Sequence, residues 1–361
     1  MVIASSSTAS RDRHAPALPP SGQAARPRID ARLEGSVRAH RVTVVAAPSG
    51  FGKTSAVAAW AADRPGRVAW LTLRAFDDRP ATVTPAIVRT LQTVLPSVAG
   101  PGGIPSIDRE GEDVHAVFEH VAEAISGHDE PLCLVIDDAH RAGSALAEGL
   151  LGALVDAGPE NLRLVVIGTG SIDGTLARWV LSHPSSVIRG DELAFDQDEV
   201  AALAGTAPDD PWVERMLATT QGWPIAVRFL HLTGLEPERA AADVLLRDYV
   251  HDHVIRQLPP HLRRFVLDTA VCDELTVELA TAITGRTDAS ALLRRCIRLG
   301  LFLDRYDTPS GVVYRWHRLF ASACREILDD IDTGRQAQVH VSAAGHLEAH
   351  DPLAAVTHWL H

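Results

Sequence analysis

Residues 47–54 read Ala-Pro-Ser-Gly-Phe-Gly-Lys-Thr, which has the residue types and spacing of a phosphate-binding loop (P-loop). Ala47 stands where the usual pattern has its first glycine, and the rest fits. Glycines let successive backbone N–H groups turn toward an anion, and the positive end of a following helix favours the same anion. We expect the Lys53 ammonium to reach the β- and γ-phosphate oxygens and the Thr54 hydroxyl to bind Mg²⁺. The loop residues predicted to contact the nucleotide are Pro48, Ser49, Gly50, Phe51, Gly52, Lys53, Thr54 and Ser55.

The lysine in this loop is unusual for the chain. Lysine and arginine together number 34 in 361 residues, and Lys53 is the only lysine. A lysine placed at random among those positions would seldom fall inside a phosphate-binding motif. A planar guanidinium does not substitute well for an ammonium in a tight phosphate site. The position of Lys53 therefore favours a P-loop, and ATP as its ligand, over a glycine-rich turn with an accidental Gly-Lys-Thr.

Two carboxylates, Asp137 and Asp138, follow the apolar run 132–136. In P-loop proteins an aspartate at the end of such a strand holds Mg²⁺, usually through water. Asp137 is therefore the predicted partner of Thr54 in the metal site, and Asp138 is predicted to orient or activate the attacking water. His140 could approach this site, but a histidine on a surface loop is the simpler interpretation.

Thr169 lies just after the next apolar run, between two glycines. At the carboxyl end of a neighbouring strand it would lie beside the γ-phosphate, where it could act as a polar sensor. A plain loop explains the same three residues.

A parallel sheet is needed to bring these groups together. From residue 26 to about 205, short apolar runs alternate with helical patterns, which predicts an α/β P-loop NTPase domain with helices on both faces of a parallel sheet. The predicted strands are 42–47, 68–73, 132–136, 162–167 and a short one within 187–195, and the predicted helices are 54–62, 81–95, 114–125 and 143–155.

After residue 205 the pattern is almost entirely helical, except for two short β runs that flank a turn. Helices followed by a hairpin are the pattern of a winged helix, here about 250–330. The predicted helices are 196–204, 212–219, 224–232, 240–257, 260–271, 274–283, 289–299 and 319–328, with β runs at 301–305 and 312–316. The predicted domains are a disordered tail (1–25), the P-loop NTPase domain (26–205), a small helical domain (206–245), the winged helix (246–332) and the start of an α-helical repeat region (333–361).

Composition limits the remaining possibilities. No run of about 18 uninterrupted apolar residues and no signal-peptide pattern occurs, so we expect a cytoplasmic protein without membrane contact. The net charge of −12 argues against a large nonspecific nucleic-acid surface. The four cysteines lack metal-ligand spacing and are predicted to be buried free thiols.

Four segments, 47–54, 132–138, 222–224 and 314–320, resemble in order the N-terminal part of the large ATP-binding LuxR-type transcriptional regulators. This group includes the maltose-type activators and belongs to the signal-transduction ATPases with numerous domains (STAND). The resemblance covers about residues 26–361.

The resemblance implies a switch operated by ATP and ADP. Pro224 would pack near the adenine, His317 would touch the β-phosphate in the ADP-bound resting state, and Arg28 would help to close over the nucleotide. Exchange of ADP for ATP, assisted by a small-molecule or protein inducer on a downstream helical-repeat domain, would open the assembly. The open form would self-oligomerise, and a C-terminal helix-turn-helix would bind DNA. Hydrolysis would be slow at most.

The sequence departs from this family in three places. Gly168 and Thr169 replace the common Ser-Arg pair, which removes a cation from the γ-phosphate side, and Arg318 replaces a common proline. The repeat region has barely begun at residue 361 and no LuxR-type DNA-binding domain is present. We therefore expect either a fragment or a shortened protein that regulates without binding DNA itself.

Two other functions remain open on the sequence alone. One is an AAA-like ATPase with steady turnover, which needs an arginine from a neighbouring subunit. The other is DNA binding by the winged helix through Arg294, Arg295 and Arg298. A solvated or interdomain face explains these three arginines more simply, given the net charge.

Overall fold

The structure is a computed structural model, and it divides the chain into two compact units. It describes residues 13–14, 25–62, 64, 67–74, 77–95, 98, 114–170, 172–234, 244–299, 301–308, 311–349 and 351–360. The first unit contains Met1–Ala47 and Gly52–Leu193. The second contains Pro48–Phe51 and Ala194–His361.

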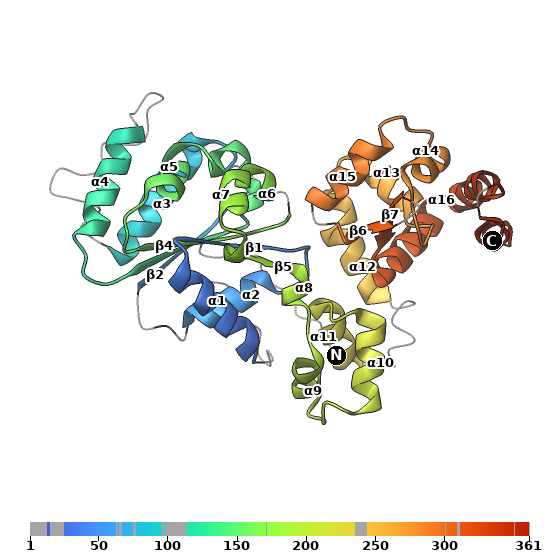
Figure 1. The fold of residues 1–361 in the computed structure, drawn as a ribbon, viewed down its shortest axis with the longest axis horizontal. Coiled ribbons are helices and arrows are strands. Elements are labelled where there is room, and N and C mark those ends of the chain that lie inside the picture. The colour runs from blue at the N-terminus through green and yellow to red at the C-terminus, as the bar shows by residue number, and fades with distance from the viewer. Residues whose placement is uncertain are drawn as a thin grey trace, which may run out of the picture. The chain divides into compact units, whose positions relative to one another are not determined.

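A five-stranded parallel sheet forms the centre of the first unit, in the order β2-β3-β4-β1-β5. Helices α1 and α2 lie on one face, and α3, α4 and α5 on the other (Figure 1). Because both faces are covered, the central strands are almost wholly apolar and buried. This confirms the predicted fold class. The strands are β1 Val42–Ala46, β2 Arg67–Thr72, β3 Leu132–Asp137, β4 Leu162–Gly168 and β5 Val187–Arg189.

The elements of the first unit follow the expected pattern with several differences, which include two helices that were not predicted, at Ile172–Thr175 and Ala177–Ser182. The predicted helix 143–155 is a 3₁₀ turn, Gly143–Leu146, followed by α5, because Gly149 interrupts it with a φ of 66°. The predicted strand within 187–195 ends at Arg189, and α8 follows. The α-helices are α1 Pro27–Ala39, α2 Lys53–Ala62, α3 Pro80–Val94, α4 Val114–Ser126, α5 Gly149–Ala157, α6 Ile172–Thr175, α7 Ala177–Ser182 and α8 Gly190–Leu193, with further 3₁₀ turns at Ala139–Arg141 and Pro184–Ser186.

Among its described residues, the second unit is mainly helical, with an antiparallel hairpin, β6 Leu303–Thr308 with β7 Gly311–Trp316, and an isolated bridge between Leu275 and Tyr314. One apolar core runs through it and includes Trp223, Phe265 and Phe320, all almost fully buried. The helices are α9 Gln197–Ala204, α10 Pro211–Thr220, α11 Pro224–Thr233, α12 Val244–His253, α13 Pro260–Thr269, α14 Val277–Thr284, α15 Ala289–Arg298, α16 Arg318–Leu347 and α17 Pro352–Trp359.

Several boundaries in this unit differ from the sequence prediction. Residues 194–204 pack here and not with the sheet, because Val200 and Ala201 of α9 belong to the same core as Trp223. Helix α16 consists of two helices that meet at a break at Asp332 (φ −159°, ψ 80°): the first ends shortly after the predicted 319–328, and the second lies within the predicted repeat region 333–361. Residues 240–243 of the predicted helix 240–257 lie outside the described residues.

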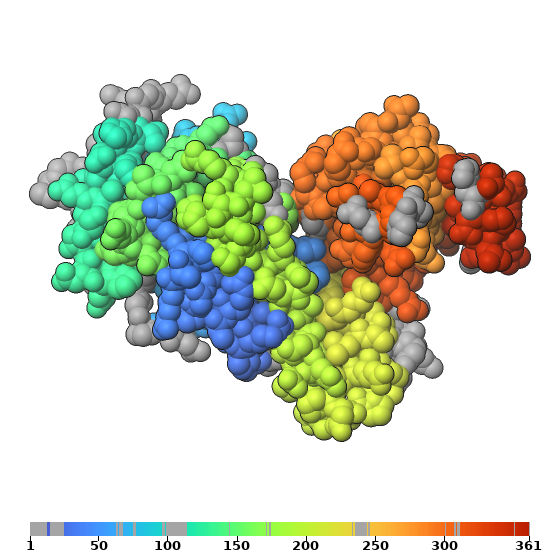
Figure 2. All heavy atoms as spheres, viewed as in Figure 1, coloured from blue at the N-terminus to red at the C-terminus, as the bar shows by residue number. Residues whose placement is uncertain are grey.

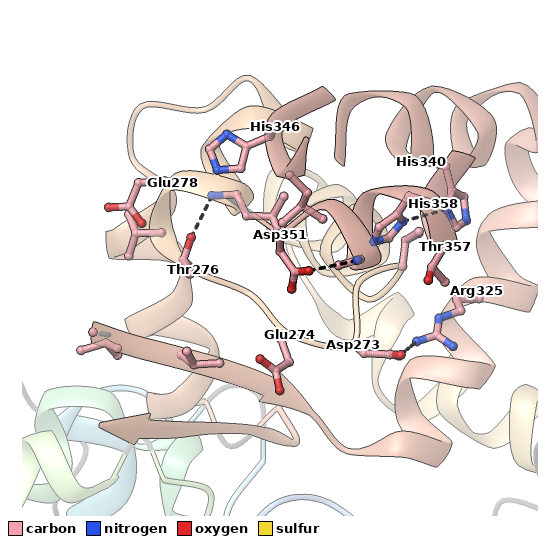
Figure 3. A pocket seen from close by; sticks show the side chains of 18 of the residues that line it. Asp273, Glu274, Thr276, Glu278, Arg325, His340, His346, Asp351, Thr357 and His358 are labelled. Atoms are coloured by element: carbon pink, nitrogen blue, oxygen red, sulfur yellow. Dashed lines mark hydrogen bonds and ion pairs between the residues drawn. The ribbon is translucent and has the colours of Figure 1, made fainter. Parts of the chain in front are cut away.

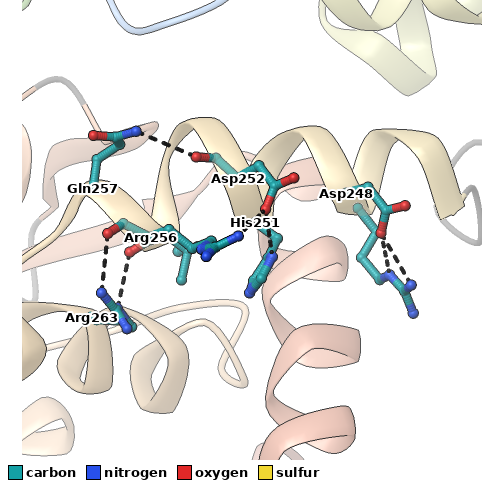
Figure 4. A network of polar contacts seen from close by, with 8 residues as sticks. Asp248, His251, Asp252, Arg256, Gln257 and Arg263 are labelled. Atoms are coloured by element: carbon teal, nitrogen blue, oxygen red, sulfur yellow. Dashed lines mark hydrogen bonds and ion pairs between the residues drawn. The ribbon is translucent and has the colours of Figure 1, made fainter. Parts of the chain in front are cut away.

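A short turn follows α12, and a side chain of the next helix holds it in place. After a break at Val254, a 3₁₀ turn, Ile255–Gln257, follows α12, and the Leu258 N–H donates to the Ile255 carbonyl at 3.2 Å. Arg263 of α13 donates to the carbonyls of Ile255, Arg256 and Leu258 at 3.1–3.2 Å. Figure 4 shows Arg263 bonded to this turn. Asp252 accepts from His251 and Arg256 on the exposed side. The predicted single helix is therefore a helix and a turn.

Most of the predicted tail 1–25 lies outside the described residues. Within it, Arg13 and His14 are placed against the first unit, where the Thr72 N–H donates to the Arg13 carbonyl at 2.9 Å. The four cysteines are buried and free, as predicted. In the described part of the chain, no helix combines the length and apolar character needed to cross a bilayer.

Candidate functional site

The tip of the predicted P-loop, Pro48–Phe51, is held within the second unit. The Ile225 N–H donates to the Gly50 carbonyl at 3.1 Å, and the Trp223 indole N–H donates to the Ser49 carbonyl at 3.4 Å. These two bonds fix the carbonyls of Ser49 and Gly50 against the start of α11. Gly50 and Gly52 have φ values of 80° and 70°, the conformation that such a loop requires.

The other half of the loop enters the first unit at the start of α2. The Thr54 hydroxyl donates to Oδ1 of Asp137 at 3.0 Å, so the two predicted Mg²⁺ ligands are in direct contact. Among the described residues, no group of three or more His, Cys, Asp or Glu is arranged to hold a metal ion. A hard cation here would take its remaining ligands from water and phosphate, which is how Mg²⁺ is usually bound. The two residues fit that ion.

Burial shifts the charges of this cluster. The Asp137 carboxyl is almost fully buried, and burial together with the charge of Asp138 raises its pKa to about 6. Burial lowers the pKa of Lys53 to about 8, although the charges of Asp138 and Asp137 oppose that change. Each ionised group here therefore costs desolvation energy that a bound cation or phosphate would repay. Such shifts are common at ligand sites.

Asp138 has a backbone conformation that is rare for a residue with a side chain, with φ 55°. Its Oδ2 accepts from Arg141 Nε at 3.2 Å, and its Oδ1 lies 4.0 Å from Nδ1 of His140. His140 lies on the 3₁₀ turn Ala139–Arg141 with its side chain partly exposed, so both interpretations of this residue stay predictions. Burial lowers its pKa, and the charge of Asp138 opposes that effect.

Gly168 ends β4 beside the strand that leads into the loop, because the Ala47 N–H donates to its carbonyl at 3.3 Å. A Cβ at this position would lie 2.8 Å from Cγ2 of Ile172 and 3.2 Å from the His140 backbone N. This close packing explains why glycine replaces the serine of the family pattern. Thr169 follows directly and is half-buried.

Arg28, expected to close over the nucleotide, is an exposed residue of α1 whose Nη1 donates to the Glu192 carbonyl at 2.7 Å. The atoms of α1 form part of the visible face of the first unit (Figure 2). Arg26, which was not singled out, is buried and donates to the Leu193 carbonyl at 2.8 Å. Both arginines therefore join α1 to α8.

Pro224 is the first residue of α11, and Gly222 precedes it with a φ of 71°. A Cβ on Gly222 would lie 2.4 Å from the Phe195 carbonyl oxygen, so only glycine fits there. The buried indole of Trp223 contacts the rings of Phe302 and His317. The Gly-Trp-Pro segment is thus both a tight turn and the support of the loop tip.

His317 precedes α16 and lies in the second unit, with about 9% of its surface exposed. Its Nε2 lies 3.1 Å from the Thr220 carbonyl, which can only accept, so Nε2 carries the proton. Its Nδ1 is buried and has no hydrogen-bond partner among the described residues. Burial lowers the pKa of His317 to about 4. Neutral His317 therefore presents an acceptor at Nδ1, and a contact with phosphate through Nδ1 requires a second proton.

A separate pocket of about 1080 Å³ lies within the second unit, between the winged helix and helices α16 and α17 (Figure 3). In its wall, Nδ1 of His340 and Nδ1 of His358 are 3.0 Å apart, and Arg325 pairs with Asp273 at 2.7 Å. An N–H···N bond needs one ring as a neutral acceptor. The described residues that line this pocket include none of those predicted to bind nucleotide.

Comparisons with known proteins agree with the two halves of this architecture. Residues 25–167 match the model of an AAA ATPase domain, and residues 251–336 match the model of a MalT winged helix domain. The chain therefore resembles the MalT-like P-loop NTPases in both of these parts. This confirms the resemblance drawn from the four segments, and the winged helix predicted for about 250–330.

Individual relatives of this MalT-like protein align with most of its length. It is 28% identical to the serine/threonine-protein kinase PknK of Mycobacterium tuberculosis over 349 residues, or 92% of this chain and 31% of that protein. It is 26% identical to the HTH-type transcriptional regulator MalT of Yersinia enterocolitica, over 83% of this chain and 35% of MalT. The chain therefore spans about a third of the length of these curated relatives.

Among solved structures, a Walker-type ATPase from Pyrococcus abyssi has a similar fold, with a TM-score of 0.56 and 14% identity. The alignment covers 83% of this chain and 95% of that protein. With the family matches, this fold makes the MalT-like chain a nucleotide-binding regulatory module.

Proposed function

We propose that this MalT-like module is a switch that binds ADP in a resting state and ATP with Mg²⁺ in an active state. One observation carries the proposal. The P-loop is shared between two packing units: Pro48–Phe51 are bonded to the start of α11, whereas Lys53 and Thr54 begin α2. A phosphate bound by the loop would therefore bear on how the loop tip packs against α11 within the second unit. A ligand can shift a conformational equilibrium only by binding the two states differently.

The roles of the individual residues follow from their chemistry. The N–H groups of 48–54 and the Lys53 ammonium would hold the β-phosphate of either nucleotide, and Thr54 with Asp137 would hold Mg²⁺. Ser55 continues the first turn of α2. We propose that Thr169 senses the γ-phosphate and that Pro224 packs near the adenine. His317 is proposed to contact the β-phosphate, and Arg28 is proposed to aid closure.

Hydrolysis is proposed to be slow. Asp138 is the residue that would orient water, but its carboxylate already accepts from Arg141 at 3.2 Å. Gly168 packs closely against Ile172, so a polar side chain at position 168 would have to displace its neighbours. The second candidate, an AAA-like ATPase with steady turnover, is favoured by the AAA ATPase match over residues 25–167.

Small-angle scattering with saturating ADP or a non-hydrolysable ATP analogue, each with Mg²⁺, tests the switch. We expect the two profiles to differ for the wild type and to coincide for Lys53→Ala, which should not bind either nucleotide. If both nucleotides bind and the two scattering profiles are identical, the switch proposal is wrong. Turnover decides the second candidate: a rate of about one per second or more, typical of ordinary enzymes, favours the steady ATPase, and a rate far below this favours the switch.

We propose the remaining partners, which are an inducer, further copies of the protein and DNA, for a longer regulator that would include this chain. MalT is named as an HTH-type transcriptional regulator. We propose that the longer protein responds to an inducer, self-associates in its ATP state and reaches DNA outside residues 1–361. DNA binding by α15 is a weaker proposal, because Arg295 is half-buried and Arg294 is bonded to Ser290 at 2.7 Å.

A further inference from the structure

Strand β2 forms one edge of the parallel sheet, so every second backbone N–H along it points away from the neighbouring strand β3. The Thr72 N–H is one of these, and it donates to the Arg13 carbonyl at 2.9 Å. The next N–H, of Leu73, points the other way and donates to the Asp137 carbonyl at 2.9 Å. The segment 13–14 therefore adds to the sheet edge at the strand end that carries the predicted metal ligand.

The Arg13 side chain reinforces this backbone contact. Its Nη2 lies 2.9 Å from Oδ2 of Asp77, a carboxylate that is only about 5% exposed. The Arg74 N–H also donates to Oδ2 of Asp77 at 2.7 Å. A carboxylate buried to this extent requires a cation, because an uncompensated charge is costly away from water. Arg13 supplies that charge from a segment 64 residues away.

His14 makes a second side-chain contact, with α3. Its Nδ1 lies 2.8 Å from the hydroxyl of Thr90, which is fully buried. That hydroxyl already donates to the Ala86 carbonyl at 2.8 Å, so it accepts from His14. His14 is therefore bound as the tautomer with its proton on Nδ1. The edge of β2, with Asp77 and Thr90, thus binds three groups of this segment: the Arg13 carbonyl, the Arg13 guanidinium and the His14 imidazole N–H.

We propose that the edge of β2, with Asp77 and Thr90, is a recognition site for a short Arg-His segment. Its occupant is the protein's own Arg13–His14, bound in cis. This surface differs from the nucleotide site, but the two are joined by one step of the β2–β3 ladder, Thr72 opposite Asp137. Occupancy of the edge therefore steadies the backbone that positions Asp137. This last consequence rests on the proposed function, whereas the recognition site does not.

Hydrogen exchange of the Thr72 amide in the full chain tests the site directly. We expect Arg13→Ala to speed exchange at Thr72 roughly tenfold, as the loss of a charge-assisted contact of ordinary strength implies, and His14→Ala to speed it less. The matched control is Arg178→Ala, which removes the exposed ion pair with Asp156 in the same unit. Unchanged protection of Thr72 in both Arg13→Ala and His14→Ala would overturn the proposal. His14→Ala keeps the test valid if Arg13→Ala fails to fold.

A labelled peptide with the sequence of residues 9–18 then tests recognition and the source of the occupant. It should bind Arg13→Ala protein, bind wild type at least tenfold more weakly, and lose binding when its own Arg13 is replaced by alanine. Equal binding to both proteins, or binding that does not need the arginine, contradicts a cis-filled site. Sedimentation supplies the other contradiction: a wild-type dimer that Arg13→Ala dissociates would mean that a second copy fills the site.

Nucleotide binding separates the two proposals. If the edge site supports Asp137, Arg13→Ala weakens nucleotide binding in Mg²⁺ but not in EDTA, and Arg178→Ala changes neither. If no nucleotide binds to the wild type, the proposed function fails, and the exchange experiment still decides the edge site.

Discussion

The Thr54 hydroxyl donates to Oδ1 of Asp137 at 3.0 Å, across 83 residues of sequence. This bond joins the first turn of α2 to the end of β3. It places a hydroxyl and a carboxylate side by side, with Asp137 largely buried. The pair fits the proposed hard-cation site, and it makes the metal dependence of nucleotide binding testable.

Asp137→Asn keeps the size of the side chain and an oxygen that can accept from Thr54, but it removes the charge. We expect the gain in nucleotide affinity that Mg²⁺ provides to fall about 10- to 100-fold, as for residues that act on a metal through water. Affinity in EDTA should stay at the wild-type value. Titration with a fluorescent ADP, with and without Mg²⁺, measures both. Asp156→Asn, on an exposed aspartate of the same unit, is the control.

The same site should depend on pH. Burial raises the pKa of Asp137 to about 6, so the carboxylate that would hold Mg²⁺ is ionised above that pH and protonated below it. The Mg²⁺ contribution to wild-type binding should therefore weaken as the pH falls through about 6. For Asp137→Asn this part of the pH dependence should be absent. A wild-type Mg²⁺ effect that stays constant from pH 7 to 5 would contradict the assignment.

Lys53 can be observed without interference because it is the only lysine of the chain. Reductive ¹³C-methylation labels its amine and the chain N-terminus, and Lys53→Arg distinguishes the two signals. Since burial lowers the pKa of Lys53 to about 8, its signal should titrate near that pH and not near the ordinary value of about 10.4. Bound ADP should raise the pKa, because phosphate favours the ammonium. A Lys53 signal that ADP leaves unmoved would remove this residue from the site.

Gly50 tests the contact between the loop tip and α11. A Cβ there would lie 2.7 Å from Cγ2 of Ile225 and 2.8 Å from Nε1 of Trp223, and φ is 80°. Gly205 has a similar φ of 70° with open space around it. Both alanine variants should lose about 1–2 kcal/mol of stability because a residue with a Cβ disfavours positive φ, but only Gly50→Ala must also displace its neighbours. Urea unfolding should show a larger loss of stability for Gly50→Ala, together with weaker ADP binding that Gly205→Ala does not share.

Much of this site could be predicted because its chemistry is local in sequence. The loop, Lys53, Thr54 and the carboxylates after β3 each follow an apolar strand, and parallel strands bring their carboxyl ends to one edge. The contacts that hold the loop could not be predicted in this way. Trp223 lies 174 residues from Ser49, and the sequence predicts only a buried ring at Trp223, not a hydrogen bond from its indole N–H to the loop.

The failed element predictions have the same physical origin. The apolar period of 143–155 fits a helix, but Gly149 packs where a Cβ would lie 2.9 Å from Cβ of Pro80, so a distant helix determines the break. His140 follows two aspartates and looks like a loop residue. It lies on a 3₁₀ turn, where a Cβ on Gly168 would come within 3.2 Å of its backbone N, and no local pattern encodes that proximity.

His317 gives the last prediction, a stability change with acid. Burial lowers its pKa from 6.5 to about 4, so the unfolded chain binds a proton between these values that the folded chain does not. Stability is therefore fully present above pH 6.5 and is lost as the pH falls toward 4, by roughly 3 kcal/mol in total. His317→Gln keeps a donor for the Thr220 carbonyl but does not titrate, so its unfolding free energy should fall less over this window. Urea unfolding between pH 7 and 4 measures the difference, with His261→Gln, on an exposed residue of α13, as the control.

Bound ADP extends this measurement to the phosphate contact that the resemblance implies. Neutral His317 donates through Nε2 to Thr220, so a phosphate at Nδ1 can be contacted only when Nδ1 is also protonated. That contact would raise the pKa of His317 in the folded state, and the acid loss of stability would shrink in the wild type relative to His317→Gln. If saturating ADP leaves the wild-type loss as steep as it is without nucleotide, His317 does not touch the phosphate, and the state-dependent link must lie elsewhere in the loop.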